Sequence, residues 1–293
     1  MIAIWLVGVA LALLFGSARA YGLAIGSGRN ARLTVPVGVA FAGAAVLATG
    51  GAAWAWRYGS PWPLWVVLGL SGVVVLAAAL VFGINAIGRV PTRGIRIRVG
   101  DRLPEFEALT ADGERWSSAS VAGERVLLKF FRGEWCPFCQ AELKRFNAME
   151  AALSARGVRV IGISKDTPEV ARRHRERDGL RFTLLCDPDL TVIRQFGLEH
   201  RRSLEISEGP RLRLFGLSMA SRPAIRHMAA PTTVLIDANG IIRFIDQTED
   251  YKIRSSPARV LGATDEAFGL TPRDGDIAER LAPEPDELGC ADC

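Results

Sequence analysis

The chain has 293 residues, 49% of them hydrophobic, and a formal net charge of +5, so it has room for more than one structural unit. Residues 1–100 contain no Asp or Glu, and eight Arg are their only charges. From Asp101 onward, 28 Lys and Arg face 31 Asp and Glu. This balance argues against nucleic acid as a partner, because the residues from Asp101 onward carry no excess of positive charge.

Three uncharged apolar runs fill the first third of the chain, at 1–18, 33–56 and 64–87. A bilayer core of about 30 Å needs roughly 20 apolar residues as a helix, which the second and third runs supply. The first run is marginal, and Ala18-Arg19-Ala20 resembles a signal-peptide cleavage site. We therefore expect a membrane region over 1–90 with two or three transmembrane helices, followed by an Arg-rich linker over 91–98.

The placement of arginine sets the expected orientation. Arg-rich segments follow the first and third runs, whereas the loop between the second and third has only Arg57. Three retained helices with the N-terminus outside put both Arg-rich segments in the cytoplasm. We therefore expect a multi-pass protein of the bacterial inner membrane, in contact with lipid, whose C-terminal domain is cytoplasmic rather than periplasmic. Cleavage after Ala20 would challenge that side.

From about Ile97 onward, apolar runs of strand length alternate with helical patterns. Strands are expected at 126–131, 158–165 and 181–185, helices at 139–156 and 167–179, a short helix ending near Gly197, a hairpin at 232–246 that turns at Asn239-Gly240, and a closing helix in "SSPARVLGA". This order predicts parallel βαβ units within a mixed α/β sheet. The resulting domain spans 99–265, with an insertion at 199–229 and a flexible acidic tail at 266–293.

Two cysteines lie where the first buried strand gives way to a helix, in "GEWCPFC". A helix N-terminus favours a thiolate and lowers the pKa of a thiol below its free value of about 8.5. Cys136 precedes the first turn and is the expected nucleophile, with Cys139 as the resolving thiol. Pro137 suits the first helical position because it lacks an N–H. Trp135 is expected either to shield one side of the dithiol or to pack at its edge.

Metal binding is the other chemistry that this spacing permits. A four-thiolate zinc site would need Cys290 and Cys293 of the terminal "CADC" as its second pair, yet nothing near them has the pattern of a folded element. We expect redox chemistry, with no metal and no cofactor. Cys290 and Cys293 are then a possible secondary dithiol on a flexible tail, and Cys186 is a packing residue.

Four separated segments, "FFRGEWCPFCQAEL", "IGIS", "CDPD" and "APTTVLIDANGIIRF", resemble the AhpC/TSA (redoxin, peroxiredoxin-like) family of the thioredoxin-fold superfamily, of the type that carries CxxC. The resemblance covers about residues 99–264. It implies a thioredoxin-like fold, a mixed sheet flanked by helices. It also makes Pro231 a cis-proline that faces the dithiol.

The sequence departs from typical peroxiredoxins at the positions that activate peroxide. Those proteins have Pro and Thr seven and three residues before the reactive cysteine. Lys129 and Gly133 hold these positions if that cysteine is Cys136, whereas Arg132 and Cys136 hold them if it is Cys139. The arginine of typical peroxiredoxins falls at Pro231.

We therefore predict a membrane-anchored thiol–disulfide oxidoreductase. Its substrate would be a disulfide-bearing protein, a low-molecular-weight thiol or a peroxide, and its electron donor would be of the thioredoxin type. A peroxiredoxin-like thiol peroxidase that reduces hydroperoxides is the first alternative. A redox-sensing or metal-binding membrane adaptor is the second. The insertion at 199–229 is interpreted as a membrane contact, a lid over the dithiol, or a solvated loop.

Overall fold

The computed structural model describes residues 2–26, 35–86, 90, 94–214, 217–247 and 249–270. The chain divides into an N-terminal unit that ends at Arg89 and a C-terminal unit that starts at Val90. Cys290 and Cys293 lie outside the described residues, as does the expected acidic tail beyond position 270.

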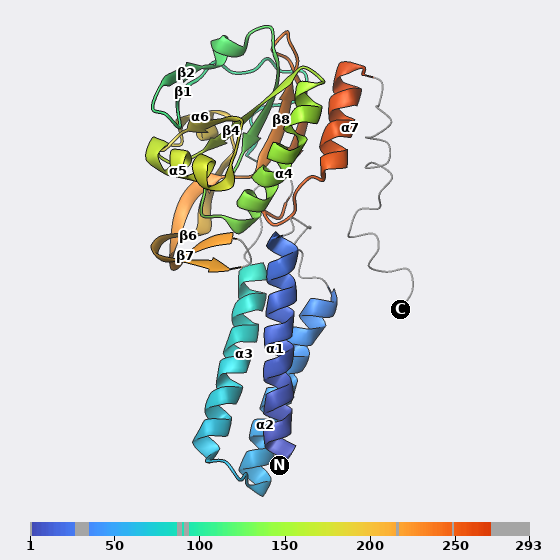
Figure 1. Ribbon diagram of the computed structural model, residues 1–293, viewed down its shortest axis with the longest axis vertical. Helices are drawn as coiled ribbons and strands as arrows, with labels where there is room; N and C mark the ends of the chain where they lie inside the picture. The colour runs from blue at the N-terminus through green and yellow to red at the C-terminus, as the bar shows by residue number, and fades with distance from the viewer. Residues whose placement is uncertain are drawn as a thin grey trace. The chain divides into compact units, whose positions relative to one another are not determined.

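The N-terminal unit consists of three helices, α1 (Ile2–Gly26), α2 (Val35–Tyr58) and α3 (Leu64–Ala86) (Figure 1). All three are long and apolar enough to cross a membrane, by length and composition. Helix α1 continues well past the end expected at residue 18. Its contact with α2 is close at Gly51, where an added Cβ would lie 3.0 Å from Val7 Cγ2 and 3.1 Å from the Ala3 carbonyl oxygen. Small residues therefore let these helices approach each other, as is usual for helices in lipid.

A seven-stranded sheet forms the centre of the C-terminal unit, in the order β2-β1-β5-β4-β3-β8-β9. Its strands are β1 (Glu107–Thr110), β2 (Arg115–Ser117), β3 (Arg125–Phe130), β4 (Val158–Ser164), β5 (Thr183–Cys186), β8 (Thr232–Ile236) and β9 (Ile242–Gln247). The pairs β3–β4 and β4–β5 are parallel and the other pairs antiparallel. The mixed α/β sheet predicted from the sequence is therefore confirmed. Strands β1 and β2 were not predicted, because runs of four and three residues that are only partly buried carry little periodicity.

The helices of this unit are the short 3₁₀ helix η1 (Ser118–Val121) and the α-helices α4 (Pro137–Ser154), α5 (Pro168–Asp178), α6 (Thr191–Gln195) and α7 (Pro257–Phe268). Thr167 precedes α5 and Pro168 is its first residue, as the sequence predicts. Helix α4 begins two residues before the expected position, at Pro137. Helix α7 ends three residues inside the segment that was expected to be a tail.

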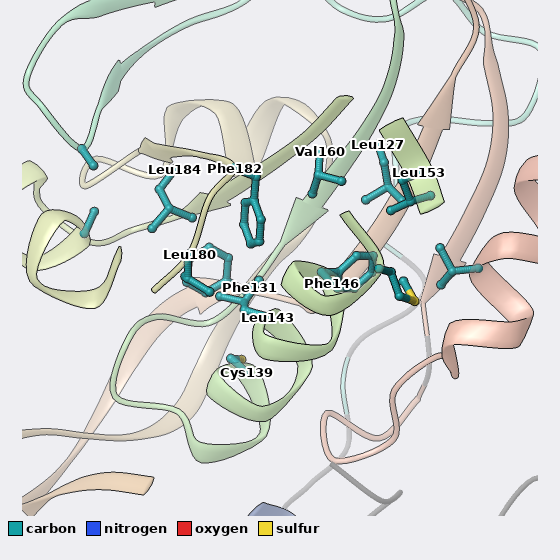
Figure 2. Packing of buried hydrophobic residues seen from close by; sticks show 14 of the residues in the cluster. Leu127, Phe131, Cys139, Leu143, Phe146, Leu153, Val160, Leu180, Phe182 and Leu184 are labelled. Carbon is teal, nitrogen blue, oxygen red and sulfur yellow. The ribbon is translucent and has the colours of Figure 1, made fainter. Parts of the chain in front are cut away.

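Alternation along β3 divides the core into two layers. Leu127 and Phe131 point to the face covered by α4 and α7, where they meet Leu143 and Phe146 of α4 (Figure 2). Val126, Leu128 and Phe130 point to the opposite face, which is covered by α6, η1 and the segment before β1. Lys129 shares the parity of Leu127 and Phe131. The strand therefore directs a lysine into the layer that also contains the cysteine-bearing helix.

Segment 199–229 adds no strand to the seven-stranded sheet. It forms a separate antiparallel hairpin of β6 (Glu199–Leu214) and β7 (Leu217–Ala229), seen beside α4 and α5 in Figure 1. We call residues 199–205 and 226–229 the hairpin base. Met228 of this base belongs to the same buried cluster as both cysteines of the CxxC motif.

Candidate active site

Cys136 and Cys139 occupy the N-terminus of α4. Cys136 is the residue that caps the helix, and its carbonyl oxygen accepts the first helical hydrogen bond, from the amide of Gln140 at 2.9 Å. Pro137 takes the first helical position, where no N–H is needed. Neither cysteine has any exposed surface. A helix N-terminus thus points its partial positive charge at two sulfur atoms that water does not reach.

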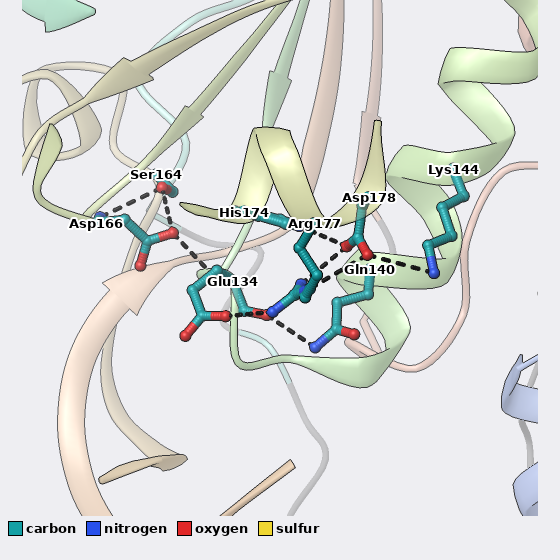
Figure 3. A network of polar contacts seen from close by, with 8 residues as sticks. All are labelled: Glu134, Gln140, Lys144, Ser164, Asp166, His174, Arg177 and Asp178. Atoms are coloured by element: carbon teal, nitrogen blue, oxygen red, sulfur yellow. Dashed lines mark hydrogen bonds and ion pairs between the residues drawn. The ribbon is translucent and has the colours of Figure 1, made fainter. Parts of the chain in front are cut away.

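A polar network fixes the loop that leads into the cysteines (Figure 3). The carboxylate of Asp166 accepts hydrogen bonds from the Glu134 amide and the Ser164 hydroxyl, both at 2.9 Å. Gln140 Nε2 donates to the Glu134 carbonyl oxygen at 2.8 Å, and Arg177 Nη1 lies 2.7 Å from Glu134 Oε2. The backbone immediately before Cys136 is therefore held from α4, from α5 and from the end of β4. We call Glu134, Gln140, Lys144, Ser164, Asp166, His174, Arg177 and Asp178 the loop network.

Helix α5 closes the loop network through Asp178. Its carboxylate is 2.8 Å from Arg177 Nη2, 3.2 Å from His174 Nε2 and 3.4 Å from Lys144 Nζ. Burial opposes the charge on Asp178, but these donors and cations outweigh it and hold the pKa of that carboxyl below its usual range. Burial raises the pKa of Asp166 to about 6, partly offset by nearby His174 and by the hydrogen bond from Ser164.

Gly133 shows why the threonine of typical peroxiredoxins is absent three residues before Cys136. Its φ is +149°, a conformation that residues with a Cβ rarely adopt. An added Cβ would also lie 2.7 Å from Trp135 Nε1 and 2.9 Å from Asp166 Oδ1. The loop network therefore requires glycine at the position that a threonine would have to occupy.

Arg132 is a buried cation beside the dithiol. Its Nη2 donates to Ser203 Oγ at 2.7 Å and to the next residue's carbonyl oxygen at 2.6 Å, and its Nε lies 3.1 Å from Met228 Sδ. Its guanidinium carbon is 4.0 Å from the ring centre of Tyr251 and 4.9 Å from that of Trp135. The hairpin base and two aromatic rings thus hold this charge in place.

A second cation, Arg254, reaches the dithiol from the segment between β9 and α7. Its Nη2 donates to Cys139 Sγ at 3.5 Å, and its Nε lies 3.0 Å from Glu142 Oε2. The other oxygen of Glu142 is 2.7 Å from Lys129 Nζ. All three charged side chains are at most 3% exposed. We call Lys129, Glu142 and Arg254 the charge relay, because these charged side chains follow one another from the sheet, through α4, to the sulfur atom of Cys139.

The hydrogen bond between the two cysteines and the nearby cations shift the pKa values of the two thiols in opposite directions. Burial opposes a thiolate at Cys136, but the hydrogen bond from Cys139 and the charges of Arg132 and Arg254 outweigh it and lower the pKa of Cys136 to about 6. Burial raises the pKa of Cys139 well above its usual value, as do its hydrogen bond to Cys136 and the charge on that sulfur. The surroundings therefore favour a thiolate at Cys136 over one at Cys139.

A sequence profile described as the AhpC/TSA family matches residues 99–245, which contain the whole CxxC motif. The chain is 37% identical over 102 residues to a protein named putative peroxiredoxin bcp from Coxiella burnetii, covering 35% of this chain and 68% of that one. It is 36% identical over 107 residues to peroxiredoxin Bcp of Escherichia coli K12, covering 36% of this chain and 69% of the relative.

The chain belongs to the AhpC/TSA family. Its enzyme class, a thiol-dependent peroxidase or oxidoreductase, is thereby confirmed at that level. Among solved structures, peroxidoxin BcpB from Mycobacterium tuberculosis matches with a TM-score of 0.46 at 20% identity, covering 60% of this chain and 100% of that one. A peroxiredoxin-like protein from Aquifex aeolicus matches with a TM-score of 0.48 at 21% identity, covering 61% and 92%.

One expectation taken from the AhpC/TSA resemblance is wrong. Pro231 lies buried just before β8, but the bond between Ala230 and Pro231 is trans, as are the other peptide bonds that the structure describes. Trans is the lower-energy form of an X–Pro bond, and the hydrogen bonds on either side, from the Ala230 amide to Leu198 and from Thr232 Oγ1 to Ala230, are made with it.

Two other residues singled out in the sequence, Trp135 and Cys186, are both buried. Trp135 is 5% exposed and packs between the loop network and Arg132. Cys186 is buried on β5, where burial and the charges of Asp166 and Glu169 raise its pKa to about 12. That pKa is consistent with the packing role expected from the sequence.

Arg254 and Glu142 were missed as site residues. Glu142 carries a weak signal, since it follows Cys139 by one turn on the face of α4 that reads as apolar. Lys129 carries a stronger one, a charge inside an otherwise apolar strand. Arg254 carries none, because 115 residues separate it from Cys139 and its own segment has no periodic pattern.

Proposed function

We propose that this enzyme is a dithiol oxidoreductase in which Cys136 attacks the substrate and Cys139 resolves the resulting intermediate. The observation that carries the proposal is the placement of the pair. Cys136 caps α4 just after the buried Arg132, whose charge lowers the pKa of this thiol, and Cys139 lies in the first turn beside Arg254. Only a thiolate is an effective nucleophile toward a disulfide.

The reaction on a disulfide has two steps. The Cys136 thiolate attacks one sulfur of the substrate, forming a mixed disulfide and expelling the other substrate sulfur as a thiolate. Cys139 then gives up its proton and attacks the Cys136 sulfur, so that the second substrate sulfur leaves with the electron pair. The substrate disulfide becomes two thiols, and a Cys136–Cys139 disulfide remains. A thioredoxin-type donor would return that disulfide to the dithiol.

A hydroperoxide is the second candidate substrate, and burial favours it. Both sulfur atoms lack exposed surface, which admits a small oxidant more readily than a protein disulfide. The Cys136 thiolate would attack the O–O bond, giving a sulfenic acid and releasing the alcohol or water. Cys139 would then displace the hydroxyl as water and form the same disulfide. The relatives named peroxiredoxin support this candidate.

We further propose that residues 1–90 anchor the enzyme in a bacterial inner membrane and that the redoxin domain, 99–265, lies in the cytoplasm. Three candidate spans and the Arg-rich segments at their ends support this arrangement. A green fluorescent protein fused to the C-terminus is expected to fluoresce, since it folds in the cytoplasm. A dark fusion that becomes active when replaced by alkaline phosphatase would place the domain outside.

Stopped-flow tryptophan fluorescence on the full chain in lipid nanodiscs tests the chemistry, with glutathione disulfide and hydrogen peroxide as separate oxidants. Cys136→Ser should abolish both reactions, and Cys139→Ser should allow one turnover that ends in a trapped adduct, visible by intact mass. The matched control is Cys186→Ala, a third buried cysteine, which should react as the wild type does. Oxidation that persists in Cys136→Ser would refute the assignment.

The two rate constants choose the substrate. A faster second-order rate with glutathione disulfide supports disulfide exchange, and a faster rate with peroxide makes the enzyme a peroxidase. One equivalent of tightly bound zinc, with no turnover of either oxidant, would favour the membrane adaptor instead.

A further inference from the structure

Arg254 contacts the wrong cysteine for a residue whose task is to activate the nucleophile. Its Nη2 lies 3.5 Å from the sulfur of Cys139, the thiol that stays protonated while Cys136 is ionised. Arg132 already provides a buried charge that stabilises the Cys136 thiolate. The position of Arg254 is therefore explained by a later step, in which Cys139 must itself lose its proton.

The groups that keep Cys139 protonated change during the reaction. Burial and the charge on Glu142 stay the same throughout; the groups that change are the hydrogen bond to Cys136 and the negative charge on that sulfur. Both exist only while Cys136 is a free thiolate. Once Cys136 is bonded to a substrate sulfur it has neither the charge nor the strong acceptor, whereas Arg254 remains beside Cys139. The same guanidinium then faces the sulfur that has to ionise next.

The charge relay fixes Arg254 for this step. Glu142 lies one turn after Cys139 on α4, and its two oxygens bind Lys129 at 2.7 Å and Arg254 at 3.0 Å. Arg254 uses Nε toward Glu142 and Nη2 toward Cys139 at the same time. The contact with Glu142 is an ion pair, and Nη2 is the atom that donates to Cys139. The planar guanidinium is wide enough to make both contacts, and a lysine ammonium on a flexible stem is a poor substitute.

We propose that Arg254 is a catalytic residue of the resolving step, where it stabilises the thiolate of Cys139, and that Lys129 and Glu142 position it. The inference rests on the proposed dithiol function. In this step the bond between Cys136 and the substrate sulfur breaks and the Cys136–Cys139 bond forms. The substrate sulfur leaves with the electron pair and takes up a proton equivalent to the one that Cys139 loses, so no further oxidant or reductant is needed.

The small disulfide 4,4′-dithiodipyridine separates the two steps, because each attack releases one absorbing thiopyridone. The full chain in nanodiscs, with Cys290→Ala and Cys293→Ala in every variant, should release two equivalents in two phases. In Arg254→Gln the second phase should slow by about tenfold or more, the size of one charge-assisted hydrogen bond. The first phase should slow less, since Arg132 remains. Intact mass after quenching should show the thiopyridyl adduct accumulating.

Two further variants guard against loss of the fold. Arg254→Lys keeps a cation beside Glu142, so it should fold and still show a slowed second phase. Glu142→Gln loosens Arg254 without removing it and should slow the second phase by a smaller factor. The matched control is Arg259→Gln, an arginine of α7 that pairs with Asp246 at 3.2 Å and is 61% exposed, which should leave both phases unchanged.

Each result has one meaning. An unchanged second phase in both Arg254 variants, or equal slowing of the two phases, overturns the role of Arg254 in resolution. A single phase in the wild type, or release by Cys136→Ser equal to that of the wild type, overturns the dithiol function itself. The two failures can be told apart, because the test of Arg254 applies only when the wild type shows two phases.

Discussion

Two polar clusters that are built differently surround the dithiol. The loop network binds backbone: Asp166 accepts the Glu134 amide, and Gln140 donates to the Glu134 carbonyl. The charge relay joins charged side chains instead: Glu142 pairs with Lys129 and with Arg254, and Arg254 donates to Cys139. Arg132, whose guanidinium lies over the Trp135 ring, adds another buried cation. One cluster therefore sets where the cysteines are, and the other sets which of them carries charge.

This difference explains how a peroxiredoxin-like frame functions without the usual activating side chains. In the register that takes Cys136 as the reactive cysteine, Gly133 stands where typical peroxiredoxins have threonine, and the loop network leaves no space for a Cβ there. The guanidinium that is missing at Pro231 is supplied from two other segments, by Arg132 before the helix and by Arg254 after β9. Positive charge is thus present beside the cysteines, but arginines at other positions of the chain provide it.

The largest expected effect breaks the loop network. Gly133→Ala forces a Cβ into a conformation with φ +149° and against Trp135 and Asp166. We expect a loss of about 2–4 kcal/mol in the free energy of unfolding. Urea unfolding of the C-terminal unit, followed by tryptophan fluorescence, measures it. Gly113→Ala, which also has positive φ but open space around the added Cβ, is the control and should lose clearly less. Equal losses would show that contacts at Gly133 are unimportant.

The next largest effect is expected on the ionisation of Cys136. Arg132→Met removes a cation that lowers the pKa of Cys136, so that pKa rises and the thiolate fraction at pH 7 falls. Alkylation of Cys136 by iodoacetamide at pH 7 should slow by about tenfold, with the pH profile displaced to higher pH. Ser203→Ala removes one hydrogen bond of Arg132 but leaves its charge, and its profile should coincide with the wild type. A displaced profile in Ser203→Ala would assign the effect to lost order rather than lost charge.

A smaller effect is expected on the pH dependence of stability, through Asp166 of the loop network. The pKa of Asp166 is raised to about 6, so the folded protein binds this proton more tightly than the unfolded chain does. The stability from this group is complete below about pH 4 and is lost as the pH rises through about 6. The difference in unfolding free energy between wild type and Asp166→Asn should therefore change by about 1 kcal/mol between pH 5 and pH 7. A constant difference would mean that Asp166 is ionised throughout.

The smallest effect is expected for an exposed ion pair, which serves as a comparison for the buried charges. Arg175 and Asp112 pair through two contacts, at 2.6 and 2.7 Å, but both side chains are substantially exposed. Exposed pairs contribute little because water and salt screen them. Asp112→Asn should leave both the unfolding curve and the alkylation rate of Cys136 unchanged within error. A clear change would mean that the domain responds to charge at a distance, which would weaken the assignment of local roles to Arg132 and Arg254.

The sequence predicted what is encoded locally. The apolar run of β3, the proline after Cys136 and the periodic face of α4 are enough to place the motif at a strand–helix junction. The hairpin of β8 and β9 was likewise predicted from its Asn239-Gly240 turn. Strands β1 and β2 were beyond reach because they are short and half exposed, so tertiary pairing rather than local pattern defines them.

The electrostatics of the site were predictable only in part. A lowered pKa at Cys136 follows from its place at a helix start, which the sequence makes plain. The contribution of Arg254 does not, because it depends on a contact over 115 residues of chain that only folding brings about. Long-range contacts of single charges leave no periodic trace in a sequence.

The complete burial of both sulfur atoms limits the rate at which any reagent reaches them. Because no surface of Cys136 or Cys139 is exposed, every reagent must wait for a transient opening before it can react. At low reagent concentration the observed rate reports the nucleophilicity of the thiolate multiplied by the open fraction. At high concentration the rate should reach a plateau equal to the opening rate itself. The height of that plateau is an upper limit on turnover with any substrate, however reactive its sulfur or oxygen.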